Sequence, residues 1–537
     1  MDQKKHTIAV IPARAGSRGI PNKNIRLIGG NPLVYYSIKT ALDCPYIDRI
    51  IVTTDSESVA TIAAHLGVAV HWRKKELCAD DVTLDAVVYD AVKGCHADYV
   101  ITMQPTSPTL KPETLSAAIR YSLDTDCDSV ISVVNRPHLS WTKKDNIVIP
   151  NYSERVNRQF LPPHYMETGA FVISKSSAIT PVSRLGKDIQ VFEISEEEAI
   201  DIDSSLDLIL ASELMVTPHV ALYVNGNKSR GIGHIYRALE IADEFYFKPD
   251  IFYDINQTDP VLFGDTKHDL IGVNGIGDLF LHVESKTYDI FINDILNTSI
   301  DYMIALKNAL PESVIINFED DGEGAHIADL VFNALYERPD SARIKSGKRY
   351  YVSPKDFLYY TPIKIKENVK KVFISFGGSD PQNYSDRILN IVKDRSYEKW
   401  SFTVVLGKAK EGVDRLFQYN KYPHINVVYN VTNMPELMSE CDIAVTSRGR
   451  TGYELAMLGI PTISMAQNRR EERHNFVSNE NGFSYIGLNP SDTVIKSTID
   501  MYLRLPMEDR LRFQEKLLAH DLRNGRQRVL SLIKSLL

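Results

Sequence analysis

The chain has 537 residues, of which 44% are hydrophobic and 24% are charged, and its formal net charge at pH 7 is -8. At about 100–200 residues per domain, this length predicts two to four domains. The acidic balance argues against a nucleic-acid-binding protein, and no stretch reaches the roughly 18 apolar residues of a membrane span. Five scattered cysteines without a CxxC pair argue against a disulfide framework and indicate a cytoplasmic protein.

Short apolar runs alternate with longer amphipathic stretches along the whole chain. This alternation predicts βαβ units with mostly parallel sheets, and therefore the α/β class. In the first part, 56–67 and 204–215 have helical spacing. The strands predicted there are 6–13, 49–54, 98–104 and 128–134.

The pattern restarts near Pro218, where a predicted helix ends and a new strand begins. We therefore place one domain at 1–216 and a second at 217–537. The second is long for one domain, and we expect two lobes, 217–350 and 351–537. Its predicted strands are 219–225, 248–254, 288–294, 313–319, 371–378, 401–407, 425–430, 442–447 and 461–466.

The loop IPARAGSRGIPNKN (11–24) directly follows the first predicted strand. Its glycines allow close approach to a ligand, and Arg14, Arg18 and Lys23 put three cations into ten residues. Such a loop suits a nucleoside triphosphate, because backbone amides and fixed cations stabilise phosphate oxygens. The Walker pattern is absent, and a solvated basic loop is the alternative.

This loop resembles the signature of the acylneuraminate cytidylyltransferases, which make CMP-sialic acid and related CMP-nonulosonates. Further segments that resemble the family follow in its order: RIIVTTDSE, RKKELCADD, MQPTSP, ETGAFVI and AIDIDSSLDL. The resemblance covers about the first 215 residues. It implies a Rossmann-like nucleotidyltransferase domain of the GT-A type and a homodimer formed through this domain.

The resemblance also implies roles for individual residues. The CTP phosphates and base edge would be held by Arg14, Ser17, Arg18, Lys23 and Asn24, with the three cations stabilising the leaving pyrophosphate. Arg73 and Asp80 would lie near the nucleotide. The sugar or the cytidine ribose would contact Gln104, Thr106 and Ser107. Arg158 would face the sugar acid, and Asp201 and Asp203 would hold a divalent metal.

The pair Asp201 and Asp203 suits that metal on physical grounds. In a strand AIDID, period two would place both carboxylates on one face. Two close carboxylates repel one another unless a cation lies between them, and oxygen donors suit Mg²⁺ or Mn²⁺ bridging to phosphate. The alternative is a polar strand end that leads into a helix cap at Ser204.

One segment departs from the family pattern. Where the family often has an arginine and an asparagine, this chain has Met166 and Thr168 in YMETGAFVI. The exchange favours a deoxy or diacylamino nonulosonic acid, of the pseudaminic or legionaminic kind, over N-acetylneuraminate.

The second domain opens with a strand, a glycine loop and a helix that begins near His234. In GxGHxxR, His234 and Arg237 lie three apart on one helix face. A dinucleotide fingerprint is disfavoured because Arg237 occupies its third glycine position. We interpret His234 as a general base or phosphate contact beside a sugar nucleotide, and a helix-capping histidine is the alternative.

Two more glycine loops follow strands, at 373–383 and 446–468. This set resembles two-lobed GT-B sugar-nucleotide enzymes, in particular the UDP-sugar hydrolase of the pseudaminic acid pathway. The resemblance implies a catalytic His234, an acidic Asp294, uridine ribose on Glu454 and diphosphate near Gly377 and Gly378. Arg448 and Arg450 depart from it. They could clamp a diphosphate, obstruct the pocket or bind a different anionic donor, and a solvated loop is the alternative.

Together these features predict a bifunctional enzyme of nonulosonate biosynthesis. The first domain would join CTP and a nonulosonic acid, and the second would hydrolyse a UDP-2,4-diacetamido-trideoxyhexose. Two alternatives stay open for the second domain: a glycosyltransferase, or a non-catalytic module that binds a sugar nucleotide.

Overall fold

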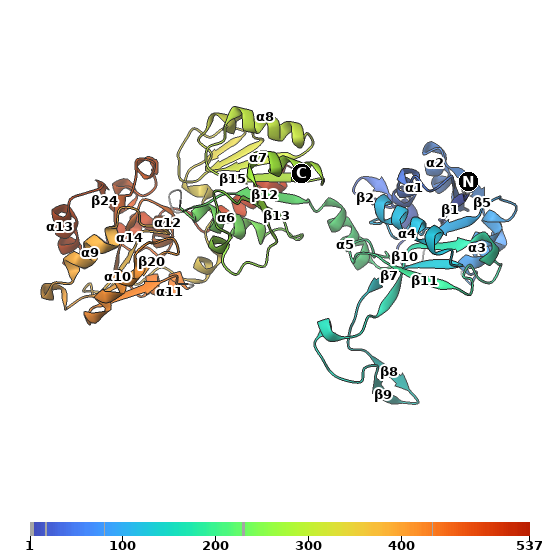
Figure 1. Ribbon diagram of the computed structural model, residues 1–537, viewed down its shortest axis with the longest axis horizontal. Helices are drawn as coiled ribbons and strands as arrows, with labels where there is room; N and C mark the ends of the chain where they lie inside the picture. The colour runs from blue at the N-terminus through green and yellow to red at the C-terminus, as the bar shows by residue number, and fades with distance from the viewer. Residues whose placement is uncertain (1–4, 17–18, 80, 228–230, 432, 537) are drawn as a thin grey trace. The chain divides into compact units, whose positions relative to one another are not determined.

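The computed structural model describes residues 5–16, 19–79, 81–227, 231–431 and 433–536. The chain divides into two compact units, Met1–Thr217 and Pro218–Leu537, coloured blue to green and green to red in Figure 1. The predicted domain boundary lies one residue before this division. In the described part no helix has the length and apolarity needed to cross a bilayer. All five cysteines are free thiols.

The first unit is built on one mixed sheet. Its strands are β1 (Thr7–Pro12), β4 (Arg49–Thr54), β5 (Ala69–Trp72), β6 (Tyr99–Thr102), β7 (Ser129–Asn135), β10 (Tyr165–Lys175) and β11 (Ile189–Glu193). Their order is β11-β7-β10-β6-β1-β4-β5, and only the ladders of β10 with β6 and β7 are antiparallel. The strands predicted at 6–13, 49–54, 98–104 and 128–134 are confirmed.

Each face of this sheet carries its own core, because buried side chains alternate along the strands. In β1, Ala9 and Ile11 belong to one cluster, while Ile8 and Val10 belong to another. The helices are α1 (Leu33–Asp43), α2 (Glu57–His65), α3 (Leu84–Val92), α4 (Pro112–Thr125) and α5 (Ser205–Val216). The first core contains residues of α1, α2 and α4, and the second contains residues of α3.

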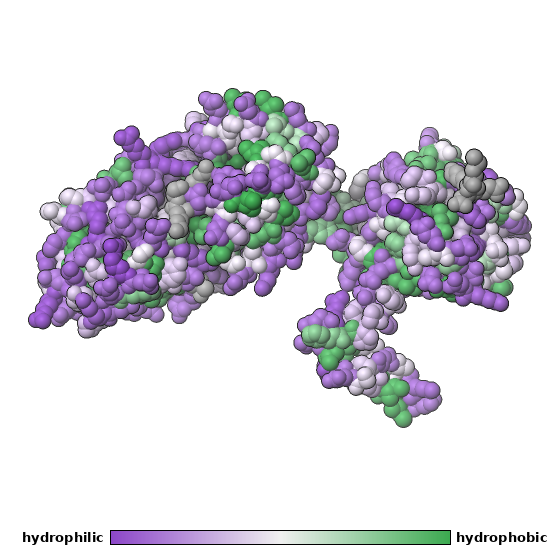
Figure 2. Space-filling view, in the orientation of Figure 1, coloured by the Kyte–Doolittle hydropathy of each residue, from purple (hydrophilic) through white to green (hydrophobic). Residues whose placement is uncertain are grey.

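A long excursion joins β7 to β10. It carries a hairpin of β8 (Trp141–Lys144) and β9 (Ile147–Pro150), which pair only with each other among the described strands. The hairpin exposes Trp141, Ile147, Val148 and Ile149. Figure 2 shows green, hydrophobic atoms at the tip of the hairpin, and Figure 1 shows the hairpin extending from the body of the unit.

The second unit begins with an all-parallel sheet. Its strands are β12 (Val220–Val224), β13 (Asp250–Asp254), β14 (Leu270–Val273), β15 (Ile290–Asp294), β16 (Val314–Phe318), β17 (Leu330–Asn333) and β18 (Ile344–Ser346), in the order β14-β13-β12-β15-β16-β17-β18. Helix α6 (Gly233–Ala242) packs on one face. The other face carries α7 (Gly275–Glu284) and α8 (Ile300–Ala309).

A second all-parallel sheet forms the other lobe. Its strands are β19 (Lys371–Ser375), β20 (Ser401–Leu406), β21 (Ile425–Tyr429), β22 (Ile443–Ser447), β23 (Thr462–Ala466) and β24 (Phe483–Leu488), in the order β21-β20-β19-β22-β23-β24. One face carries α9 (Tyr384–Val392), α10 (Val413–Phe417) and α13 (Asp492–Tyr502). The other face carries α11 (Met434–Ser439), α12 (Arg450–Met457) and α14 (Met507–Leu518).

The last helix, α15 (Gly525–Lys534), returns to the first lobe. Val529 and Ile533 join the core formed by β12, β15 and α6. Arg526 contacts the carboxylate of Glu240 and donates from Nη2 to the carbonyl of Ser353 (2.7 Å). The predicted C-terminal boundary of the lobe 351–537 was therefore wrong, because α15 packs on the first lobe. Two parallel α/β lobes confirm the expected GT-B-like architecture.

Candidate functional site

A lysine–carboxylate contact lies beyond the carboxyl end of β1 in the first unit. Lys23 donates from Nζ to the carbonyl of Ile202 (2.6 Å) and to Oδ1 of Asp203 (3.2 Å). The Lys23 side chain is 14% exposed, whereas that of Asp203 is 78% exposed. The fold thus joins two predicted site residues that are 180 positions apart.

The glycine loop is anchored at both of its described ends. The amide of Ala15 donates to Oδ1 of Asp55 (2.7 Å), which follows β4. The side-chain amide of Asn24 donates to the carbonyl of Arg14 (2.9 Å). Asn24 therefore shapes the loop that carries Arg14, rather than only contacting a ligand.

The predicted strand for Asp201 and Asp203 is wrong. Residues 200–203 form a loop before α5, because Ser204 caps that helix through a reciprocal capping box with Asp207. The alternation of burial persists, since Ile200 and Ile202 are buried while Asp203 is exposed. The capping alternative is confirmed at Ser204, and it leaves both carboxylates available.

Two glycines allow the chain to approach these aspartates closely. A Cβ on Gly19 would lie 2.5 Å from the carbonyl oxygen of Asp203. A Cβ on Gly169 would lie 3.0 Å from Oδ2 of Asp201. A larger residue at either position would therefore collide with one of the two aspartates.

Buried polar atoms lie at and near Asp201. Its Oδ1 and the hydroxyl of Ser107 are buried without a hydrogen-bond partner among the described residues. The hydroxyl of Thr106 lies close enough to the Asp201 carboxylate to oppose a rise in its pKa. The carbonyl of Thr106 accepts from the amide of Ile202 (2.9 Å), and the amide of Gln104 donates to the carbonyl of Gly169 (3.3 Å). Burial, followed by the charge of Asp203, raises the pKa of Asp201. Unpaired buried polar groups are costly, so they indicate a ligand site.

Two other residues predicted for the site of the first unit, Arg73 and Arg158, make no described contact with Lys23 or Asp203. Arg73 donates from Nη2 to the carbonyl of Thr53 (3.1 Å), and burial lowers its pKa. Arg158 lies on the long excursion and forms an exposed ion pair with Glu196 (3.3 Å). No hydrogen bond or ion pair of the described residues joins Arg158 to Lys23 or Asp203. The predicted residues Ser17, Arg18 and Asp80 lie outside the described residues.

The departure at Met166 lies on β10. Met166 is 45% exposed, while Thr168 donates from Oγ1 to Oγ of Ser132 (2.7 Å). Met166 is therefore available to a ligand, and the Thr168 hydroxyl is occupied within the sheet.

A buried ion network lies at the carboxyl ends of β15 and β16 in the second unit. His234 Nδ1 contacts Oδ1 of Asp294. Arg237, one helical turn along α6, donates to the same carboxylate from Nε (2.7 Å) and Nη2 (2.6 Å). Its Nη1 donates to Oε1 of Glu319 (3.2 Å). Arg237, Asp294 and Glu319 are each at most 3% exposed.

The network fixes the protonation of His234. Burial lowers its pKa, although the charge of Asp294 opposes that shift. Burial alone would raise the pKa of Asp294, but Arg237 and His234 hold it below its ordinary value. A carboxylate only accepts hydrogen bonds, so Nδ1 of the neutral imidazole carries the proton. No described residue bonds Nε2, which can therefore accept a proton from a ligand or water.

The remaining predicted residues lie where the two lobes of this unit meet. Gly377 has a φ of +72°, which favours glycine. A Cβ on Gly378 would lie 2.7 Å from Cγ1 of Ile232, in the loop before α6. Glu454 on α12 lies 3.5 Å from the hydroxyl of Tyr351, and burial raises its pKa. The two glycine loops thus contact each other across the lobes.

Neither Arg448 nor Arg450 is a solvated loop residue or a free diphosphate clamp. Arg448 donates from Nη1 to the carbonyl of Glu472 (3.0 Å) and also contacts the carbonyl of His474. Arg450 donates to the carbonyl of Val352 (2.9 Å). Both guanidiniums therefore hold backbone segments together.

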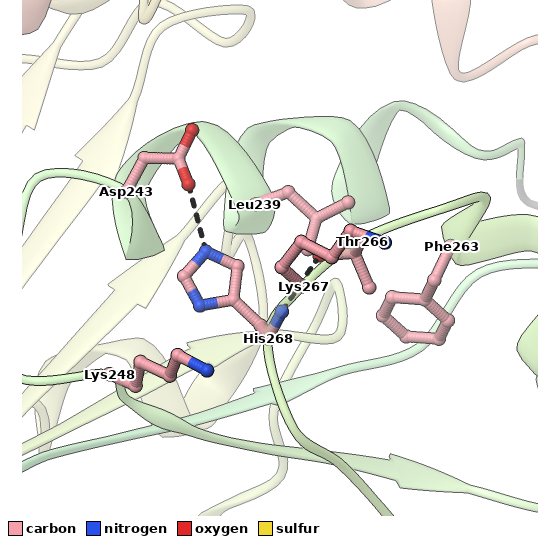
Figure 3. A pocket seen from close by; sticks show the side chains of 7 residues that line it. All are labelled: Leu239, Asp243, Lys248, Phe263, Thr266, Lys267 and His268. Atoms are coloured by element: carbon pink, nitrogen blue, oxygen red, sulfur yellow. Dashed lines mark hydrogen bonds and ion pairs between the residues drawn. The ribbon is translucent and has the colours of Figure 1, made fainter. Parts of the chain in front are cut away.

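Two cavities were found in the second unit. The larger, of about 390 Å³, is lined by Lys248, Lys267 and His268, whose Nε2 contacts Oδ1 of Asp243 at 2.9 Å (Figure 3). It lies beside the C-terminal end of α6, about 13 Å along the helix from His234. The smaller, of about 300 Å³, is lined by Asn297 and Arg470 among others. It lies near the ion network, because the charge of Arg470 helps to lower the pKa of His234.

Comparison with known proteins identifies the first unit. Residues 8–204 match the family model described as Cytidylyltransferase. A CMP-N,N'-diacetyllegionaminic acid synthase of Legionella pneumophila is 33% identical over 233 residues, which are 40% of this chain and 98% of that protein. The chain belongs to the cytidylyltransferase family.

Other known proteins resemble only one part of this cytidylyltransferase. The N-acylneuraminate cytidylyltransferase A of Danio rerio is 31% identical over 222 residues, which are 39% of this chain and 51% of the relative. The chain thus spans about half the length of such relatives. A crystal structure of MurG from Acinetobacter baumannii matches with a TM-score of 0.43 and 13% identity, over 59% of this chain and 99% of that one.

Two residues of the cytidylyltransferase's sites were missed by sequence reasoning. Asp55, which anchors the glycine loop, lies inside the segment RIIVTTDSE, to which no role was assigned. Glu319 ends the predicted strand SVIINFE just as Asp294 ends IFIND. An acidic residue at the carboxyl end of a buried parallel strand was the signal available in both cases.

Proposed function

We propose that the first unit transfers CMP from CTP to a nonulosonic acid and releases pyrophosphate. The observation that carries this proposal is the contact of Lys23 with Asp203, which brings the cationic loop to the acidic pair. The anomeric hydroxyl of the sugar would attack the α-phosphorus of CTP. Lys23 and Arg14 would stabilise the charge that develops on pyrophosphate as it leaves.

Asp201 and Asp203 would hold Mg²⁺ or Mn²⁺. Their oxygen donors, the unpartnered Oδ1 of Asp201 and its raised pKa fit a hard cation, which would relieve the repulsion between the carboxylates. When bound, the cation would neutralise phosphate charge. No cluster of three or more His, Cys, Asp or Glu was found among the described residues, so substrate oxygens would complete its shell.

The acceptor would be a diacylamino nonulosonic acid. The exposed Met166 offers an apolar contact, and the Legionella relative is named for diacetyllegionaminic acid. The exposed apolar hairpin, including Trp141 and Ile149, supports a homodimer through the first unit, because burying it against a second copy would remove apolar surface from water.

The experiment is product analysis by mass spectrometry after incubation with CTP, Mg²⁺ and a panel of nonulosonic acids. We expect a CMP-sugar and pyrophosphate with a legionaminic or pseudaminic type of acid. In Asp203→Asn, loss of one carboxylate should lower the rate by about 10³-fold or more. Near-normal turnover of Asp203→Asn at low Mg²⁺ would remove the proposed metal role.

We propose further that the second unit hydrolyses a UDP-sugar to UDP and free sugar. The supporting observation is Nε2 of His234, which lies opposite the Asp294 contact and can take a proton from water. Glu454 would bind the ribose, and Gly377 and Gly378 would lie near the diphosphate. A glycosyltransferase would use the same base toward an acceptor hydroxyl, and a binding module would use none.

His234→Ala should reduce UDP release from a UDP-diacetamido sugar by about 10²–10⁴-fold while CMP-sugar formation continues. Unchanged UDP release in that variant would refute the catalytic role. UDP release only when an acceptor is added would favour the transferase, and binding without turnover would favour the module.

A further inference from the structure

The smaller cavity of the second unit is strongly cationic. We call it the arginine pocket. Its volume is about 300 Å³, and it is lined by Asn297, Asp321, Tyr336, Arg469, Arg470 and Arg473. Sequence reasoning assigned none of these residues a role.

The arginine pocket lies at the carboxyl ends of both sheets. Asn297 follows β15 and Asp321 follows β16, the strands that lead to Asp294 and Glu319 of the ion network. The arginines come from the loop after β23 in the other lobe. Ligands of open parallel sheets bind at this edge. Arg470 is also close enough to His234 to contribute to lowering its pKa.

The positive charge of the pocket is only partly compensated. Arg470 contacts the neutral hydroxyl of Tyr336, and the guanidiniums of Arg470 and Arg473 lie 5.3 and 5.4 Å from the centre of the Tyr336 ring. Asp321 is contacted by both Arg473 and Arg338. No acidic side chain of the described chain forms an ion pair with Arg469 or Arg470.

Hydrogen bonds outside the pocket hold the backbone of the loop that carries the arginines. Glu471 directs its carboxylate to the amide of Gln467 (2.9 Å) and to the Gln467 side chain (3.1 Å), away from an ion pair with its arginine neighbours. Arg448 binds the carbonyls of Glu472 and His474. Because these contacts hold the backbone of the loop, less backbone conformational entropy is lost there when a ligand binds.

We infer that the arginine pocket binds an oxyanion of the sugar nucleotide on which the second unit acts. Guanidinium groups match the geometry of carboxylate and phosphate, and Arg470 is partly buried in the pocket. The oxyanion has two sources: a nucleotide phosphate, or a sugar carboxylate such as the proposed product of the first unit would carry. This inference rests on the proposed function only in assigning a sugar nucleotide to the second unit.

The test is equilibrium binding by calorimetry to the full chain. The probes are UDP, UDP-glucose, UDP-glucuronate and CMP-N-acetylneuraminate. UDP-glucuronate differs from UDP-glucose in having a carboxylate in place of the C6 hydroxymethyl group. The variants are the triple change R469Q/R470Q/R473Q and the single change R469Q, which removes no described hydrogen bond. The control is R512Q, because Arg512 is 75% exposed on α14. Hydrolysis is measured separately as UDP release, so its absence leaves the binding result interpretable.

We expect the triple variant to bind at least one probe about tenfold or more weakly than the wild type, and R469Q to show a smaller loss in the same direction. If the pocket binds the sugar carboxylate, the wild type prefers UDP-glucuronate to UDP-glucose and the triple variant loses that preference. If it binds phosphate, the triple variant weakens UDP and both UDP-sugars alike. Unchanged binding in folded triple and R469Q variants, an equal loss in R512Q, or no binding of any probe to the wild type would overturn the inference.

Discussion

Replacing Asp294 with asparagine would remove a buried charge that both His234 and Arg237 contact, with little change in side-chain shape. Removing one partner of a buried ion pair costs about 3–5 kcal/mol, because the other charge is left without compensation. Here Glu319 still accepts from Arg237 at 3.2 Å, and the amide oxygen still accepts one hydrogen bond. We therefore expect the lower end, about 3 kcal/mol. At about 2 °C per kcal/mol for a unit of this size, the second unit should melt about 6 °C lower.

Differential scanning calorimetry of the full chain measures this change. The matched control is Asp289→Asn, just before the other end of β15, where the exposed Asp289 side chain accepts only from the amide of His219 (2.7 Å) among the described residues. That variant should lower the free energy of unfolding of the second unit by about 1 kcal/mol or less. Pyrophosphate release by the first unit should be unchanged in both variants. Equal melting temperatures for Asp294→Asn and Asp289→Asn would refute the description of a buried, mutually dependent ion network.

Three further predictions follow from single contacts. Gly19→Ala should destabilise the first unit by about 1–3 kcal/mol and reduce its activity, since the new Cβ would meet the Asp203 carbonyl, whereas Gly16→Ala, with nothing within 4 Å, should leave the melting temperature nearly unchanged. Burial lowers the pKa of His474 from 6.5 to about 4, so the unfolded chain binds the proton more readily. The second unit should therefore lose up to about 3 kcal/mol as the pH falls from 6.5 to 4, and His474→Gln should abolish that part of the pH dependence of melting. The fragment 1–217 should fold and release pyrophosphate alone, and a folded but inactive fragment would contradict the assignment of the sites to one unit.

Local patterns in the sequence were enough to predict the α/β class and most strands. Each predicted strand has alternating buried residues, and β12 illustrates why: Val220, Leu222 and Val224 enter one core while Ala221 and Tyr223 enter the other. A strand with two buried faces is a continuous apolar run, and its signal needs no distant partner. Short or partly exposed strands gave weaker signals and were not predicted: β5, β8, β9, β11, β14, β18 and β24. The buried strand β17 and the partly buried strand β10 were also not predicted.

Spatial relations between distant residues came from the tertiary structure. The order of segments and their resemblance to a family indicated Lys23, Asp201 and Asp203, but the packing of the chain joins Lys23 to Asp203 and replaces the expected strand with a capped loop.

The same limit applies to the second unit. His234 and Asp294 were predicted, whereas Glu319, the return of α15 and the arginine pocket depend on which strand ends and loops lie side by side. Periodicity within a segment reports which face of that segment is buried. It carries no information on which other segment covers that face, because that choice depends on shape and charge across the whole fold.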